Sequence, residues 1–246
     1  KVIIAAAGTG GHINPGIAIA NKIKKEEPDS KIIFIGTQRG LETDLVPRAG
    51  YELKTIDSYG IARKITLSNI AKLFKTMMSV RQAKKIIKEF KPDIIVGTGG
   101  YICVSVCMAA KKTKTPYILH ESNVMPGIAT KLFAKNAKKI LVGFEEAKEK
   151  ISDEANVVVT GTPTKMSKYI YDADIIDQKI MQMGFDDEKP IILAFGGSQG
   201  SKSINKSMLE IITNKLTQNK YQIVWATGTE QYDDIKKQLL EKDLNI

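Results

Sequence analysis

The chain has 246 residues and a formal net charge of +10, from 37 Lys and Arg against 27 Asp and Glu. Its 43% hydrophobic and 26% charged residues are typical of a folded globular protein, and no apolar run approaches the ~18 residues of a membrane-spanning helix. Two cysteines, Cys103 and Cys107, form no metal or redox motif and fit a reducing cytosol. The excess charge predicts an anionic partner: nucleic acid, a membrane surface or an anionic substrate.

Short apolar runs alternate with longer helical patterns along most of the chain. The runs predict strands at Val2–Ala7, Ile32–Gly36, Leu53–Asp57, Asp93–Gly97, Pro116–His120, Lys139–Gly143 and Val157–Gly161. The helical patterns between them include Ile13–Glu26, Leu67–Phe90 and Val104–Lys112. Because the runs are nearly continuous in Val, Ile and Leu, we expect strands buried on both faces. The alternating order predicts an α/β fold with a doubly wound parallel sheet.

The pattern changes near Pro163. We predict a first domain over residues 1–163, a linker over residues 164–188 and a second domain over residues 189–246. The second domain holds only two strand–helix units, with expected strands at Ile191–Phe195 and Gln222–Ala226. Two parallel strands cannot bury both faces of a sheet, so we expect this domain to be incomplete in the sequence, or to be completed by a partner chain.

Glycine-rich turns follow three of the strands, at Gly8–His12, Gly97–Tyr101 and Gly196–Gly200. Glycines let backbone N–H groups approach a ligand, and the following helix N-terminus adds unpaired donors that suit phosphate or sugar oxygens. Ile13 stands where a dinucleotide-binding fingerprint needs Gly, and Ser201 interrupts a P-loop pattern. The turns therefore predict phosphate or sugar binding rather than NAD binding or ATPase chemistry.

Two histidines stand beside the expected strand ends. His12 follows the first turn at a helix start, where the helix N-terminus would lower its pKa; a ligand or catalytic role is favoured over capping. His120 ends a strand, where a hydrogen bond to the backbone is the favoured role. The next residues include Glu121 and Asn123, a carboxylate and an amide of the kind that hold sugar hydroxyls.

No metal site and no cofactor are predicted. Asp172 and Asp174 match the spacing seen in metal-dependent sugar transferases, but they lie at an expected helix start, where Asp caps N–H groups. With two histidines and no Cys/His cluster, the chain offers no metal-ligand set.

Basic and apolar residues are interleaved along the helix expected at Leu67–Phe90. Its apolar positions follow helical spacing, at Ile70, Leu73, Phe74 and Met77, and its basic residues include Lys72 and Lys75. Such a helix can lie on an anionic membrane surface. The alternative is that the apolar stripe packs on the sheet and the lysines are solvated. Nucleic acid is disfavoured as a partner because no stacking surface or reading motif accompanies the charge.

Together these segments resemble the MurG family of peripheral membrane glycosyltransferases. The resemblance runs in order through Gly8–Pro15, Gly40–Pro47, Gly97–Tyr101, Leu119–Asn123 and Gly196–Gly200. It implies a GT-B architecture of two doubly wound domains, the second incomplete here. It also implies an inverting, metal-free transfer of N-acetylglucosamine from UDP-N-acetylglucosamine to lipid I, which gives lipid II in peptidoglycan synthesis, a step in cell wall biogenesis, cell shape and cell division. The implied location is peripheral, on the cytoplasmic face of the cell membrane.

Two alternatives stay open. One is another GT-B transferase that acts on a different lipid acceptor, such as diacylglycerol. The other is a non-catalytic fragment that binds a membrane surface.

The resemblance also implies site residues. His12 is the candidate base or proton relay, and Glu121 is the second catalytic candidate, in contact with sugars or the acceptor diphosphate. The substrate-binding candidates are Thr9, Gly10, Gly11, Tyr101, Asn123, Lys165, Ser198 and Gln199. Lys165 stands where the family usually has Arg, so it keeps the charge without the bidentate fork. The membrane patch would comprise Ile70, Lys72, Leu73, Phe74, Lys75 and Met77.

Overall fold

A computed structural model describes residues 1–58, 67–151, 153–164, 173–186, 188–197, 200–214, 220–242 and 244. In the helices that begin at Leu67 and Ala173, side chains are described from Met77 and Ile175 onward. The chain divides into two compact units, Lys1–Ser167 and Lys168–Ile246. Each unit has a parallel sheet of its own.

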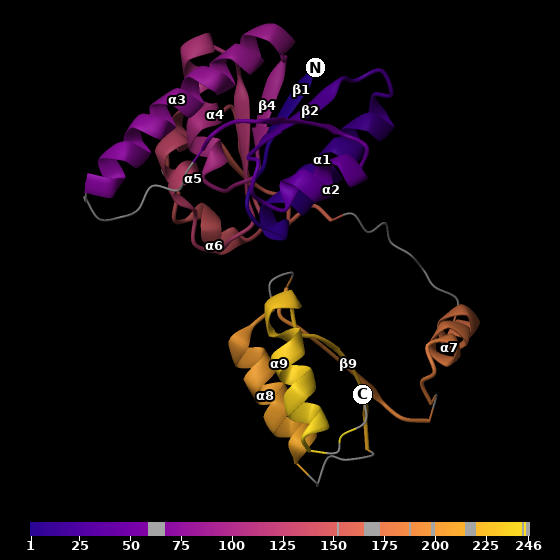
Figure 1. The fold of residues 1–246 in the computed structure, drawn as a ribbon. Coiled ribbons are helices and arrows are strands. Elements are labelled where there is room, and N and C mark those ends of the chain that lie inside the picture. Colours follow the sequence, from indigo (N-terminus) through magenta and orange to yellow (C-terminus); the bar gives the residue numbers. More distant parts are fainter. Residues whose placement is uncertain are drawn as a thin grey trace. The chain divides into compact units, whose positions relative to one another are not determined.

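The first unit is a seven-stranded sheet with helices on both faces (Figure 1). Its strands are β1 (Val2–Ala5), β2 (Ile32–Gly36), β3 (Glu52–Thr55), β4 (Ile94–Gly97), β5 (Tyr117–Glu121), β6 (Ile140–Val142) and β7 (Val157–Val159). Its helices are α1 (Gly10–Glu26), α2 (Glu42–Arg48), α3 (Leu67–Phe90), α4 (Ile102–Thr113), α5 (Ile128–Phe133), the 3₁₀ turn η1 (Ala134–Asn136) and α6 (Glu145–Lys148). The strand order is β3-β2-β1-β4-β5-β6-β7, and every neighbouring pair is parallel. The predicted doubly wound α/β fold is therefore confirmed.

The alternation of side chains along β1 creates two cores, one on each face of the sheet. Ile3 and Ala5 lie in the core that includes residues of α3, α4 and α6, whereas Ile4 lies in the core with α1 and α2. Both layers are apolar and both are covered, which explains why the strands read as continuous apolar runs.

The helices change face between β1 and β4. After β1 the chain continues into α1 on one face, and after β4 it continues into α4 on the other. Open α/β sheets bind their ligands beyond the carboxyl ends of the strands at such a reversal. The first two glycine-rich turns lie at this place.

The second unit contains α7 (Ala173–Gln182), β8 (Ile191–Phe195), α8 (Lys202–Thr213), β9 (Gln222–Ala226) and α9 (Thr229–Leu240). Helices α8 and α9 lie side by side (Figure 1). Along β8, Ala194 is buried, while Leu193 and Phe195 are 62% and 61% exposed. In the described residues, therefore, helices cover only one face of this two-stranded sheet.

The part of the chain that the structure describes contains no helix with the length and apolar character needed to span a bilayer.

Candidate functional site

The first glycine-rich turn leads from β1 into α1. Gly8 has a φ of +96°, a conformation that favours glycine. The N–H groups of His12 and Ile13 donate to the carbonyl of Thr9, at 3.0 and 3.2 Å, and so begin the helix. The N–H groups of Gly10 and Gly11 stand in the first helical turn, where no intrahelical acceptor exists. They can bind a phosphate or sugar oxygen there.

The second turn, after β4, packs directly on the first. Thr98 donates its hydroxyl to the carbonyl of His12 at 2.7 Å and its N–H to the carbonyl of Ala5 at 3.0 Å. Gly99 has a φ of +116°, and a Cβ there would overlap the His12 imidazole. A Cβ on Gly100 would lie 2.6 Å from the carbonyl oxygen of Ala7. Only glycine allows the two turns to meet in this way.

His12 is half-buried between these turns. Burial lowers the pKa of its imidazole, while the charge of Glu121 and a hydrogen bond to the Thr98 backbone act in the opposite direction. From the sequence, the helix N-terminus is expected to lower the pKa of His12, whereas in the structure the main cause of the lowered pKa is desolvation of the ring by burial. A neutral imidazole at the carboxyl edge of the sheet is suited to accept a proton.

Glu121, at the end of β5, is 5% exposed and accepts four hydrogen bonds. Its Oε1 accepts from the backbone and side-chain nitrogens of Asn123, at 3.0 and 2.7 Å. Its Oε2 accepts from the Gly127 N–H and the Thr130 hydroxyl, both at 2.8 Å. The carboxylate thus fixes the loop between β5 and α5, and its charge raises the pKa of His12. This geometry favours a positioning role.

His120 is buried at the same strand end. Its Nε2 lies 3.3 Å from the carbonyl oxygen of Gly161, and its Nδ1 lies 3.4 Å from the Ser122 hydroxyl. The predicted backbone hydrogen bond is confirmed. Burial lowers the pKa of His120, which favours the neutral ring.

The carboxyl edge of the sheet brings together the predicted site residues of the first unit. These are Thr9, Gly10, Gly11, His12, Tyr101, Glu121 and Asn123. A Cβ on Gly8 would lie 4.0 Å from Cε1 of Tyr101, so this ring borders the first turn. Lys165, Ser198 and Gln199 lie outside the described residues, as do the side chains of Ile70, Lys72, Leu73, Phe74 and Lys75. Met77 is described and is 58% exposed on α3.

Glu42 received no role from the sequence, although it lies in one of the motifs. It is fully buried and accepts hydrogen bonds from Gly8 and Thr37. A carboxylate directly after Gly40 and Leu41, in a turn that follows a buried strand, is the signal that could have identified it.

Comparison with known families matches both units. The glycosyltransferase family 28 N-terminal domain matches residues 2–142, and the glycosyltransferase family 28 C-terminal domain matches residues 191–246.

Curated relatives cover the whole chain. The proteins of Acetivibrio thermocellus and Clostridioides difficile are 40% and 39% identical to it and cover 100% of it. Both are named UDP-N-acetylglucosamine–N-acetylmuramyl-(pentapeptide) pyrophosphoryl-undecaprenol N-acetylglucosamine transferase. The chain spans 66% and 59% of their lengths, less than two thirds.

Solved structures share the fold. A crystal structure of Acinetobacter baumannii MurG is 22% identical with a TM-score of 0.65, and the match covers 100% of this chain and 66% of that one. Anabaena HepE in complex with UDP-glucose is 12% identical with a TM-score of 0.65 and the same coverage. The expected resemblance to MurG enzymes is confirmed.

Proposed function

We propose, because this chain belongs to glycosyltransferase family 28, that it transfers N-acetylglucosamine from UDP-N-acetylglucosamine to lipid I, with inversion and without a metal. One observation carries the proposal: the His12 imidazole lies between two glycine-rich turns at the ligand-binding edge of the sheet. The relatives named for this reaction are 36–40% identical to the chain over nearly its whole length.

The proposed reaction requires one proton to move from the acceptor sugar to His12. The acceptor sugar's 4-hydroxyl loses its proton to His12 while its oxygen forms a bond to the anomeric carbon of the donor sugar. The bond from that carbon to the UDP oxygen breaks on the opposite side, so the configuration inverts. Burial lowers the pKa of His12 and so favours the neutral imidazole, the form that can accept this proton.

The other residues bind and orient in this proposal. The N–H groups of Gly10 and Gly11 hold the acceptor diphosphate, and Tyr101 borders the acceptor sugars. Glu121 holds Asn123 in place for its sugar contact.

The two domains divide the substrates between them in the same proposal. The acceptor and the membrane are bound by residues 1–163. The donor is bound by residues 189–246 through Ser198 and Gln199, and Lys165 of the linker is a further substrate-binding candidate.

A radiolabel transfer assay tests the function. The protein is expressed from its complete reading frame and incubated with labelled UDP-N-acetylglucosamine and a lipid I analogue. We expect labelled lipid II, and a His12→Ala variant about 10²-fold slower or worse. No transfer by the unaltered protein would overturn the assignment. Competing diacylglycerol in the same reaction tests the acceptor class, and label on that lipid would favour a different lipid-acceptor transferase.

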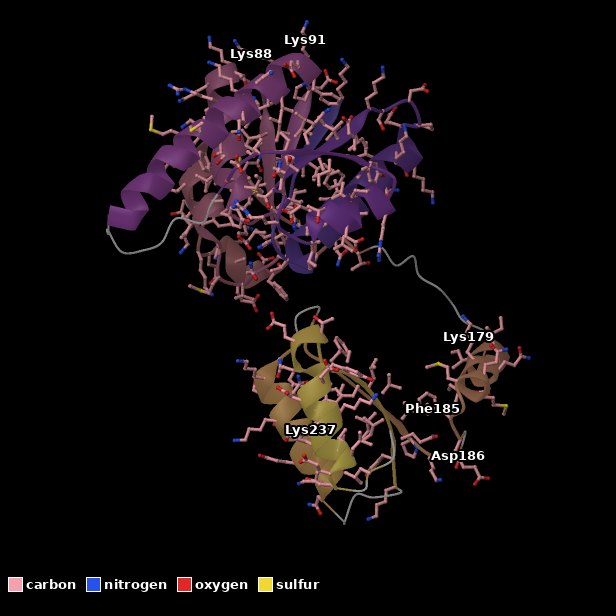
Figure 2. The ribbon with its side chains drawn as sticks, in the orientation of Figure 1. Lys88, Lys91, Lys179, Phe185, Asp186 and Lys237 are labelled. Atoms are coloured by element: carbon pink, nitrogen blue, oxygen red, sulfur yellow. The ribbon has the colours of Figure 1, made fainter. Side chains whose placement is uncertain are left out.

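We also propose that the face carrying α3 lies on the anionic cytoplasmic surface of the cell membrane. Apolar side chains are exposed on α3 and on α5: Met77 by 58%, Ile128 by 54% and Leu132 by 60%. Basic side chains lie on α3 and directly after it, and Lys88 and Lys91 project from its C-terminal end (Figure 2). An apolar surface with lysines around it is what peripheral binding to anionic lipid requires.

Vesicle co-sedimentation tests this surface. Each lysine near an anionic membrane contributes about 1 kcal/mol, so changing Lys72 and Lys75 to Glu should weaken binding to phosphatidylglycerol vesicles by about 30-fold or more. A matched control changes Lys22 and Lys25 to Glu on α1, which covers the other face of the sheet. Equal effects of the two pairs would show that only net charge matters.

A further inference from the structure

We propose that Glu42 is a positioning residue, which locks Gly8 so that the first glycine-rich turn presents its remaining N–H groups to the acceptor diphosphate. The inference rests on the proposed function. It also explains the Gly40–Leu41–Glu42 segment, which carries family resemblance without an assigned role.

Glu42 stands at the start of α2 and is completely buried. Its Oε2 accepts the N–H of Gly8 at 2.9 Å. Its Oε1 accepts the N–H of Thr37 at 2.9 Å and the hydroxyl of Thr37 at 2.7 Å. The carboxylate therefore ties together the turns that follow β1 and β2, which are 34 and 5 residues away from it in the chain.

Gly8 is held at both of its backbone polar groups by the same segment. Its N–H donates to Glu42, and its carbonyl oxygen accepts the N–H of Leu41 at 3.5 Å. This double contact holds Gly8 at a φ of +96°, where the chain reverses from β1 toward α1. Since the Gly8 N–H points into the protein, a ligand meets the N–H groups of Gly10 and Gly11 instead.

Two glycines make room for the carboxylate. A Cβ on Gly36 would lie 2.7 Å from Cγ of Glu42, and a Cβ on Gly40 would overlap the carboxylate itself. Neither glycine has a positive φ, so their backbone conformations do not require glycine. The Glu42 side chain occupies the space that these glycines leave, so a Cβ at either position would displace it.

Replacing Glu42 should affect function through the first glycine-rich turn. In the Glu42→Gln variant, one of the two acceptor oxygens is replaced by an NH₂ group, which cannot accept from a backbone N–H. If the Gly8 N–H loses its acceptor, the turn is no longer held in this conformation, and the N–H groups of Gly10 and Gly11 are no longer oriented toward the diphosphate. Affinity for a diphosphate should fall, whereas an exposed carboxylate on the same helix should be dispensable.

The test uses the full ¹⁵N-labelled chain and inorganic pyrophosphate as the probe. In the unaltered chain, we expect the Gly8 amide to be protected from hydrogen exchange and pyrophosphate to shift the Gly10 and Gly11 amides. In Glu42→Gln, we expect Gly8 protection to disappear and pyrophosphate to bind about tenfold more weakly. Asp44→Asn is the matched control, at an exposed position of α2 that pairs with Arg48. It should leave the protection of the Gly8 amide and the pyrophosphate affinity unchanged.

Two further variants separate positioning from general stability. Thr37→Val removes one hydrogen bond of Glu42 but leaves its bond to Gly8, so affinity should change less than about threefold. Gly40→Ala keeps the charge of Glu42 but displaces its carboxylate, so it should weaken pyrophosphate binding as Glu42→Gln does. It replaces Glu42→Gln in the test if that variant does not fold.

The outcomes distinguish this inference from the proposed function. Unprotected Gly8 in the unaltered chain, or equal pyrophosphate affinity in Glu42→Gln, overturns the role of Glu42. If Thr37→Val and Glu42→Gln weaken pyrophosphate binding by the same factor, Glu42 has only a structural role. No glycosyl transfer by the complete protein, together with Glu42-dependent pyrophosphate binding, overturns the proposed function alone. Absence of pyrophosphate binding by the unaltered chain overturns the role of Glu42 in diphosphate binding, whereas the proposed function is still decided by the transfer assay.

Discussion

Changing Glu121 to Gln tests whether this carboxylate organises the site or acts directly on the substrate. The substitution keeps the size of the side chain and removes its charge. All four donors around Glu121 point at it, and two of them are backbone N–H groups, from Asn123 and Gly127. In either orientation of the Gln amide, its NH₂ group faces one of these N–H groups, so one buried donor loses its acceptor.

The expected loss of stability follows from this one unpaired buried donor. A buried donor without an acceptor costs about 1–3 kcal/mol, and the remaining bonds lose the strength that the charge gives them. We therefore expect the free energy of unfolding of the first unit to fall by roughly 2–4 kcal/mol. Thr130→Val removes one hydroxyl donor from the same carboxylate and should lower it by about 1 kcal/mol.

The assay uses the position of the single tryptophan. Trp225 lies in β9 of the second unit, so its fluorescence reports that unit, while far-UV circular dichroism also reports the first. In urea titrations, Glu121→Gln should move the main dichroism transition to lower urea and leave the Trp225 transition in place. Glu145→Gln, at an exposed carboxylate on α6, is the control and should move neither.

A stability change below about 0.5 kcal/mol in Glu121→Gln would show that the hydrogen bonds of this carboxylate do not stabilise the loop between β5 and α5. If transfer also fell sharply in that stable variant, Glu121 would act directly on the substrate rather than through the loop.

The remaining predictions concern His12 and its surroundings. The acid limb of kcat/KM should have its midpoint below pH 6.5, since burial lowers the pKa of His12, and Glu121→Gln should move it lower still, since the Glu121 charge raises that pKa. Both His12 and His120 have lowered pKa values in the folded state, so the unfolded chain binds protons at a higher pH than the folded chain. The urea midpoint of unfolding should therefore be constant well above pH 6.5 and fall as the pH drops below it. A midpoint that stays the same from about pH 7.5 to 5 would contradict this prediction. Gly99→Ala should lower transfer by at least about tenfold because its Cβ displaces His12, whereas Gly50→Ala, at a φ of +83° with open space around it, should cost about 1–2 kcal/mol of stability and leave transfer intact.

The sequence predicted the elements of the first unit well because its strands are buried on both faces. A run such as Ile32–Gly36 has no polar residue to interrupt it, and the observed β2 has the same bounds. The start of α1 was predicted at Ile13, but the helix begins at Gly10. Glycine is a poor helix former, so local preference indicated a turn, and contacts from the second glycine-rich turn hold the helix start instead.

The contacts within the site could not be read from the sequence. Thr98 meets His12 across 86 positions, and Gly8 meets Glu42 across 34. Both contacts depend on the strand order, which places β1 between β2 and β4. Composition and periodicity reveal that a strand exists, but they do not specify its neighbours. The function of a buried carboxylate such as Glu42 is therefore visible only once the sheet is assembled.

Two buried carboxylates beside a proposed diphosphate site raise an electrostatic question, because like charges repel. Glu42 and Glu121 each accept hydrogen bonds from backbone N–H groups, so their charge is balanced by the loops they hold. Glu121 also offsets part of the effect of burial on the pKa of His12. Under the proposed function, the acceptor diphosphate adds further negative charge near the imidazole. That charge favours the protonated ring and so raises the pKa of His12. Binding of the acceptor would thus strengthen the base that its own hydroxyl requires.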